Sequence, residues 1–181
     1  YDVFPVGSKH EPHLGLAVGD VVGKGVAAAL LMSSVRSSLR AFADEVYALD
    51  EIVARTNRAL ARDTLESEFA TLWYGVLDPR TLRLTYCNAG HDPPVLIRGG
   101  EIVKQLDVGG MIVGDGITDA SNFEMKRFHK RRLIDAVLTT LAANPNASAA
   151  EVVEGVFWQI RQFVGLNKQA DDQTLLVMRV R

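Results

Sequence analysis

Three short stretches of the 181-residue sequence place aspartates where an apolar run begins or ends. Asp20 stands in AVGDVVGKG, Asp115 and Asp119 stand in DGITDA, and Asp171 and Asp172 come directly before TLLVMRV. A carboxylate at the end of a buried strand is costly unless it is hydrogen-bonded, ion-paired or bound to a cation. Carboxylate and carbonyl oxygens are the ligands that Mg²⁺ and Mn²⁺ prefer. The pattern is therefore consistent with a divalent-cation site, and equally with ordinary Asp-Gly turns when spacing alone is considered.

The glycine-rich stretch 19–25 is close to a phosphate-binding loop but does not match one. A P-loop has four residues between its first glycine and the Gly-Lys pair, which Ser or Thr follows. Here three residues separate Gly19 from Gly23, and Gly25 follows Lys24. No hydroxyl stands where a P-loop holds magnesium, so we do not expect nucleotide binding. The glycines instead allow a sharp turn from strand to helix.

The composition indicates a folded domain of ordinary make-up. Hydrophobic residues make up 48% and charged residues 23%, and the net charge is -2. This balance argues against disorder and against bulk attraction to nucleic acid or to an anionic membrane. A single cysteine, Cys87, excludes an internal disulfide and a cysteine-cluster zinc site. The longest apolar stretch is far shorter than the roughly 20 residues that span a bilayer, and no signal peptide is recognisable. We therefore expect a cytoplasmic domain without membrane insertion.

Strand-type and helix-type patterns follow one another along the chain and place the aspartates at element ends. The turns DPRT and Gly99-Gly100 predict hairpins, Asp50 is a candidate N-cap, and Ser148 with Glu151 matches a capping box. This order predicts an α+β layered sandwich of mostly antiparallel strands and paired helices. Strands are expected at 13–22, 69–77, 82–88, 94–97, 101–106 and 174–180, and helices at 25–46, 49–63, 128–143 and 149–164.

Taken in order, these motifs resemble the SpoIIE/RsbU branch of the PPM (type 2C-like) metal-dependent serine/threonine protein phosphatases. The resemblance rests on YDVFP, LGLAVGDVVGKGVAAALLMS, Asn57, FATLWYGVLD, LTYCNAGHDPPVLIR, DGITDASN and DDQTLLVMRV, and it covers the chain nearly end to end. It implies a four-layer α-β-β-α sandwich with two central, mostly antiparallel sheets, formed by residues 1–181 as one domain.

The resemblance also implies a site with two Mn²⁺ or Mg²⁺ ions. Asp20 would bridge the ions, and the backbone carbonyl of Val21 would be a further ligand. Asp115 and Asp171 would bind the second ion. A water activated between the ions would attack the phosphorus of phosphoserine or phosphothreonine, so that Asp20, Asp115 and Asp171 would be catalytic through the metal.

Four further residues have expected roles in or near this site. Asp119 would support a weaker third ion, and Asp172 would be an alternative ligand or would support its neighbour. Since no protein nucleophile is needed, Cys87 is expected only to pack in the core. His91, in the turn GHDPP, would either hydrogen-bond the turn or act near the site.

The sequence departs from the family pattern in two places. The family has a metal-binding aspartate in a Gly-Gly-Asp stretch just ahead of Tyr1, and strand alternation would point the nearby Asp2 away from that position. The family also has roughly two dozen residues between Gly114 and Asp115, including a strand. Either the natural polypeptide has more residues at this junction, or a genuine deletion weakens the enzyme. The second case favours a non-catalytic PPM-fold module that binds a phosphoprotein or regulates a partner.

The resemblance implies partners as well. The usual substrate in this branch is a phosphorylated STAS-domain antagonist of an anti-sigma factor, in a bacterial partner-switching pathway. A sensor or receiver domain usually precedes the catalytic domain in the same polypeptide, and the helices at 25–46 and 49–63 would receive its signal. A metal-binding domain of another hydrolase class is the remaining alternative.

Overall fold

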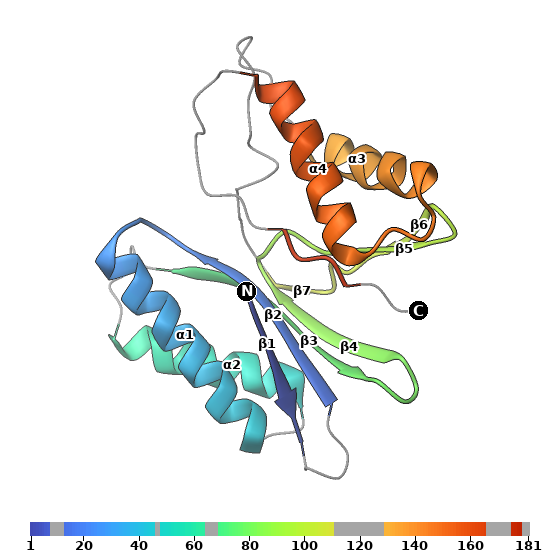
Figure 1. Cartoon of the computed structure of the whole chain (residues 1–181). Helices are drawn as coiled ribbons and strands as arrows, with labels where there is room; N and C mark the ends of the chain where they lie inside the picture. Colours follow the sequence, from blue (N-terminus) through green and yellow to red (C-terminus); the bar gives the residue numbers. More distant parts are fainter. Residues whose placement is uncertain (8–12, 46–47, 64–68, 111–128, 166–174, 179–181) are drawn as a thin grey trace. The chain divides into compact units, whose positions relative to one another are not determined.

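The computed structural model describes residues 1–7, 13–45, 48–63, 69–110, 129–165 and 175–178 (Figure 1). The chain divides into two compact units. The first comprises Tyr1–Pro94 and Gln105–Gly114, and the second comprises Val95–Lys104 and Asp115–Arg181.

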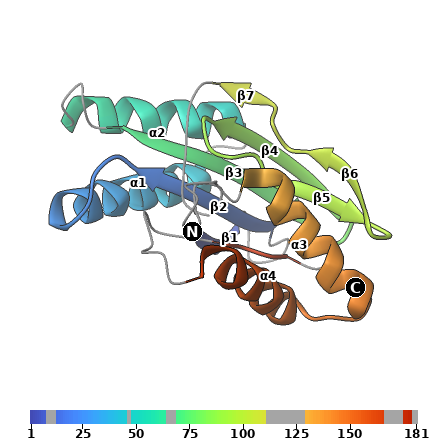
Figure 2. The same cartoon turned by 90° about the horizontal axis from the view of Figure 1, so that it is seen from above.

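The first unit contains a five-stranded sheet with two helices on one face. The strand order is β1-β2-β3-β4-β7; the first four strands pair antiparallel, and β7 is parallel to β4. Helices α1 and α2 pack against each other and against these strands (Figures 1 and 2). The elements are β1 (Asp2–Val6), β2 (His13–Val21), α1 (Val26–Glu45), α2 (Leu49–Asp63), β3 (Ala70–Asp78), β4 (Arg83–Ala89) and β7 (Gly109–Gly110).

Strand alternation divides the apolar side chains of this sheet between its two faces. On the helix side, Phe4, Ala17 and Tyr74 are buried with Leu39 of α1 and Ile52 of α2. The opposite face has its own apolar cluster, formed by Leu14, Leu16, Trp73, Leu84, Tyr86 and Leu106. Both faces of the sheet are therefore apolar near its middle, and polar side chains are confined to the strand ends and edges.

The second unit contains β5 (Val95–Arg98), β6 (Glu101–Gln105), α3 (His129–Ala143) and α4 (Ala149–Val164). Strands β5 and β6 form a hairpin whose turn residues have φ angles of 60° and 80°, which glycines 99 and 100 adopt without strain. The two helices lie side by side (Figure 2) around the buried side chains of Ala136, Val156 and Ile160.

The structure confirms the α+β class with two sheets and two helix pairs, and it also confirms the predicted hairpins. The capping box at α4 is present, since the Glu151 amide donates to Ser148 Oγ at 3.2 Å and the Ser148 amide donates to Glu151 Oε2 at 2.7 Å. The Asp50 cap is wrong. Helix α2 begins at Leu49, so Asp50 lies in its first turn, where a carboxylate still favours the helix dipole.

Three further differences concern strands, the first being β1 (Asp2–Val6), which is absent from the strand ranges expected above. Residues 175–178 were expected within a closing strand at 174–180, yet they form neither strand nor helix, and the rest of that range lies outside the described residues. A strand needs a neighbouring strand to bond its backbone, and no described strand pairs with this segment. Strand β7 was not predicted at all, because two glycines carry no strand-type pattern.

Asp2 joins β1 to α1 through two arginines. Its carboxylate lies 3.0 Å from Arg36 Nε and 2.6 Å from Arg40 Nε, and its side chain is only 13% exposed. Arg40 also donates through Nη2 at 2.8 Å and stacks over the ring of Phe4. As expected from strand alternation, Asp2 lies on the helix side of the sheet, as Phe4 does.

Replacement of Asp2 by asparagine is expected to lower the free energy of unfolding by roughly 1 kcal/mol at pH 7. The loss is modest because the two arginines are about half exposed, so solvent screens both ion pairs. The hydrogen bond from Arg40 chiefly lowers the pKa of Asp2 below its ordinary value of 3.8. The stabilisation is therefore fully present above that ordinary value and is lost as the pH falls through the lower, folded-state pKa. Urea unfolding between pH 7 and about pH 3 should show the difference from wild type shrinking in acid. A difference that stays constant with pH would contradict the ion pair, and the exposed Asp107→Asn serves as the control.

Candidate metal centre

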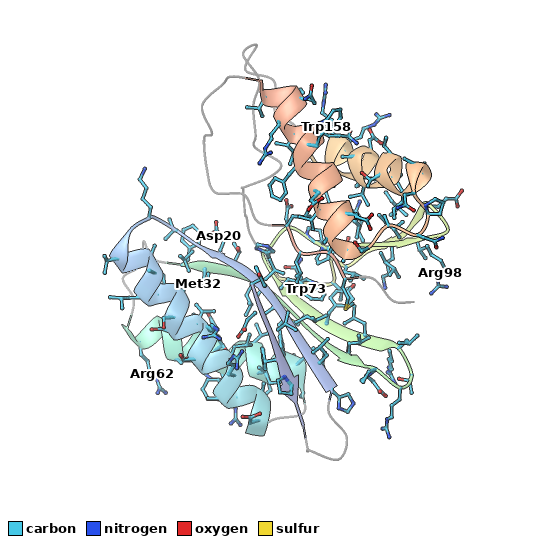
Figure 3. All side chains as sticks on the ribbon, viewed as in Figure 1. Asp20, Met32, Arg62, Trp73, Arg98 and Trp158 are labelled. Carbon is cyan, nitrogen blue, oxygen red and sulfur yellow. The ribbon has the colours of Figure 1, made fainter. Side chains whose placement is uncertain are left out.

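Asp20 lies at the end of β2, on the face of the sheet that is turned away from α1 and α2. Figure 3 shows it where the strand leads toward the start of α1. It alternates with Leu14 and Leu16 of the second apolar cluster, so its side chain shares their face. In the strand register Asp20 is directly opposite Thr71 of β3. The two side chains are therefore neighbours on one face at the sheet's end.

The side chain of Asp20 is exposed, and its carboxylate is not paired with any group in the described part of the chain. None of the described residues donates a hydrogen bond to it or forms an ion pair with it. Asp2 contrasts with it, because Asp2 is bound to two arginines on the other face. An unpaired carboxylate at a strand end is available to an external cation.

The backbone carbonyl of Val21 is also without a partner among the described strands. The amide of Val22 donates to the carbonyl of Phe69 at 3.0 Å. Hydrogen-bonded and non-hydrogen-bonded pairs alternate along an antiparallel ladder, so Asp20 and Thr71 form a bonded pair and Val21 and Ala70 a non-bonded one. The Val21 carbonyl therefore points away from β3, toward the side where β1 pairs. Strand β1 meets β2 only as far as Ala17, so no described residue of β1 lies opposite Val21.

Glycines shape the turn that follows. Gly23 and Gly25 have φ angles of 94° and 80°, which side chains other than glycine rarely adopt. They turn the chain from β2 into α1, whose first turn is closed by the Ala29 amide donating to the Gly25 carbonyl at 3.1 Å. Gly19 has a different use, because a Cβ there would approach the Thr71 carbonyl to 2.7 Å. Because glycine has no Cβ, β3 can lie close to β2 next to Asp20.

A hydrogen-bonded group of three residues lies beside Asp20. Buried Asn88 holds the His91 backbone twice, because its Nδ2 donates to the His91 carbonyl and its Oδ1 accepts from the His91 amide, each at 2.8 Å. The His91 ring nitrogen Nδ1 lies 2.9 Å from Thr71 Oγ1. The same hydroxyl is 3.5 Å from the Asp20 carbonyl, which is a weak contact at best. The turn GHDPP is thus fixed against the end of β3.

Burial lowers the pKa of His91 below its ordinary value of 6.5, although the negative charges of Asp92 and Asp20 act in the opposite direction. The imidazole is therefore neutral at pH 7. The His91 ring bonds Thr71 of β3, whereas the His91 backbone is held by the side chain of Asn88, and a role of the ring near the metal site stays a prediction.

The other expected metal ligands, Asp115, Asp119, Asp171 and Asp172, lie outside the described residues. Among the residues that the structure does describe, no three histidines, cysteines, aspartates or glutamates come together. Asp20 and the Val21 carbonyl offer two oxygen donors of the kind that Mn²⁺ and Mg²⁺ bind, so this half of the centre fits such an ion. Sequence reasoning missed Thr71, because only the strand register reveals that it faces Asp20.

The comparisons with known proteins agree with this architecture. The family model for stage II sporulation protein E (SpoIIE) matches residues 10–114, which is more than half of the chain. The chain belongs to the SpoIIE family. It falls in the SpoIIE/RsbU-type branch of the PPM phosphatases, as the sequence motifs predict.

Two relatives and one solved structure are also similar to this chain. Protein IcfG of Synechocystis sp. is 28% identical over 230 residues, covering 98% of this chain and 35% of IcfG. Phosphoserine phosphatase RsbU of Bacillus subtilis is 24% identical over 198 residues, covering 94% of this chain and 57% of RsbU. A crystal structure of a stage II sporulation E family protein from Thermanaerovibrio acidaminovorans has a TM-score of 0.46 and 15% identity, covering 65% of this chain and 55% of that one.

The alignment lengths bear on the junction between Gly114 and Asp115. The chain spans only 35% and 57% of the lengths of IcfG and RsbU. The alignment with IcfG is also longer than the 181 residues of this chain, so IcfG has extra residues inside the aligned region. The SpoIIE match ends at Gly114, the last residue before the junction.

Proposed function

We propose that this SpoIIE-family chain is a metal-dependent phosphoprotein phosphatase that hydrolyses phosphoserine or phosphothreonine. The observation that carries the proposal is the end of β2, where the Asp20 carboxylate has no described partner and the Val21 carbonyl points off the ladder. RsbU, a phosphoserine phosphatase by name, aligns with 94% of this chain and supports the same activity. None of the helices in the described ranges is both long and apolar enough to cross a membrane.

In this proposal Asp20 and the Val21 carbonyl would hold Mn²⁺ or Mg²⁺, with Asp20 as the ligand common to two ions. Asp115 and Asp171 would hold the second ion, while Asp119 would support a weaker third ion and Asp172 would be an alternative ligand. When bound, the ions supply an activated water and neutralise charge on the phosphoryl oxygens. The chain's own contribution is to hold these oxygen ligands at the ends of its strands, so that no cysteine or serine nucleophile is required.

The proposed substrate is a phosphorylated STAS-domain antagonist of an anti-sigma factor, and the proposed location is the cytoplasm. A sensor or receiver domain in the same polypeptide would control the activity. These assignments rest on the membership in the SpoIIE/RsbU branch.

The test is phosphate release from a phosphoserine-bearing STAS antagonist, using the natural full-length protein. We expect turnover with Mn²⁺ or Mg²⁺, none in EDTA, and recovery when the metal is returned. A folded protein that releases no phosphate with either metal would overturn the proposal. Turnover that persists in EDTA would overturn the metal-dependent mechanism.

The longer alignment with IcfG and the SpoIIE match ending at Gly114 keep a second candidate in play for the case of a true deletion, namely a PPM-fold module that binds a phosphoprotein without hydrolysing it. The intact mass of the natural protein separates the cases. A continuous Gly114–Asp115 bond in that protein would mean a true deletion and would favour the binding module. Additional residues at the junction would restore the missing strand and favour the enzyme.

A further inference from the structure

Thr71 is the one residue of β3 that both faces Asp20 and is held by a side chain from another segment. It is 3% exposed and is a backbone hydrogen-bonding partner of Asp20 in the ladder. Its hydroxyl is 2.9 Å from Nδ1 of His91, and the backbone of His91 is in turn fixed by Asn88. A buried threonine with this bond has little freedom to rotate, because the hydroxyl would otherwise lose its partner.

The neighbouring side of Asp20 has no comparable support. Strand β1 does not reach Asp20 in the described register, and the turn that follows contains two glycines in left-handed conformations. Among the described strands, only β3 therefore supports the end of β2. The end of a strand that is hydrogen-bonded on one side only can tilt unless the residue it pairs with, here Thr71, is itself held in place.

Given the proposed metal site, we propose that His91 and Thr71 are positioning residues that hold the Asp20 end of β2 in the geometry needed to bind a divalent cation. Asn88 fixes the His91 backbone, His91 fixes the Thr71 side chain, and Thr71 fixes Asp20 through the ladder. Neither His91 nor Thr71 needs to touch the ion. Partners that orient ligands in this way commonly change metal affinity by 10–100-fold.

The experiment compares Thr71→Val, which keeps the shape and removes the hydroxyl, with Thr71→Ser, which keeps the hydroxyl. His91→Leu removes the other half of the bond, and the exposed Thr85→Val is the matched control for a threonine-to-valine change in a strand. Two quantities are measured on each folded variant: the Kd for Mn²⁺ alone, by titration calorimetry, and hydrogen exchange at the Val22 amide in the metal-free protein. The Val22 amide reports directly on the β2–β3 end through its bond to Phe69.

We expect Thr71→Val and His91→Leu each to raise the Kd for Mn²⁺ about tenfold and to speed exchange at Val22 about tenfold. The double variant should be no worse than either single one, because both substitutions break the same bond. Thr71→Ser and Thr85→Val should resemble the wild type. Exchange at the Leu16 amide, which bonds Gly75 in the middle of the same sheet, should not change in any variant.

Unchanged Mn²⁺ affinity and unchanged Val22 exchange in both Thr71→Val and His91→Leu would overturn the inference. A general loss of stability of the sheet, which would speed exchange at Leu16 as much as at Val22, would also overturn it, because the role would then be merely structural. Should Thr71→Val fail to fold, His91→Leu decides by the same two measurements. If the wild type binds no Mn²⁺, the proposed function fails, and Val22 exchange alone then decides whether the brace exists.

Discussion

Replacement of Asp20 by asparagine is expected to reduce metal-dependent phosphate release by about a thousandfold. Asparagine keeps the shape and one carbonyl oxygen but removes the negative charge with which Asp20 would bridge two cations. A metal stabilises the transition state of such a reaction by several kcal/mol, and about 4 kcal/mol corresponds to about a thousandfold in rate. The measurement is kcat/KM on the phosphoserine substrate across a Mn²⁺ titration, with the natural full-length protein.

The structure predicts that this variant still folds. Asp20 is exposed, and within the described ranges its carboxylate makes no hydrogen bond or ion pair that the substitution could break. The unfolding midpoint should therefore stay close to that of the wild type, and the exposed Asp107→Asn should keep full activity. Wild-type activity in Asp20→Asn would remove Asp20 from the catalytic centre. Loss of activity accompanied by unfolding would contradict the structural reading of this strand end.

The sequence predicts elements well where their signals are local. Helices α2 and α4 span the ranges expected from the sequence, because the apolar spacing of both helices and the Ser148–Glu151 box of α4 are local signals, although the Asp50 cap of α2 was wrong. The two hairpins follow from their turns, for the same reason. In the first, Asp78 accepts a hydrogen bond from the Arg80 amide at 2.9 Å and another from the Thr81 hydroxyl at 2.8 Å.

Structural features that depend on contacts with other parts of the chain could not be predicted from local sequence patterns. Residues 175–178 have a strand-type composition, but a strand forms only where another strand offers its backbone. Strand β7 shows the reverse case, because Gly109 and Gly110 pair with Asn88 and Ala89 despite low strand propensity. Asp50 is a third case, because it lies two residues beyond Ala48, which precedes the first helical residue, and is therefore part of the helix and not its cap.

The candidate site divides in a similar way. Residue type and position drew attention to Asp20, and the family resemblance added the Val21 carbonyl; in the strand register neither group has a described partner that would occupy it. Thr71 carries no motif of its own and becomes interesting only because it faces Asp20 and bonds His91. The roles of Asp115, Asp119, Asp171 and Asp172 stay predictions, because they lie outside the described residues.

Replacement of Leu39 by alanine is expected to lower the free energy of unfolding by about 2–5 kcal/mol. Leu39 is 2% exposed and belongs to the buried cluster in which α1 and α2 meet Phe4, Ala17 and Tyr74 of the sheet. Truncation removes apolar contacts and leaves a cavity, because helices held by several neighbours cannot collapse fully into the space. Domains of this kind have about 5–15 kcal/mol in total, so the variant would lose a large share of its stability. Urea unfolding followed by circular dichroism measures the change.

Leu30→Ala is the matched control, since Leu30 stands on the same helix but is 64% exposed. We expect a change within about 0.5 kcal/mol there, as for other surface substitutions. The contrast tests the orientation of α1 directly, because a helix rotated by half a turn would expose Leu39 and bury Leu30. Equal losses in the two variants, or a larger loss in Leu30→Ala, would contradict the packing of α1 on the sheet. The connection between Asp20 and α1 would then need revision as well, because the turn at 22–25 joins the ligand strand to this helix.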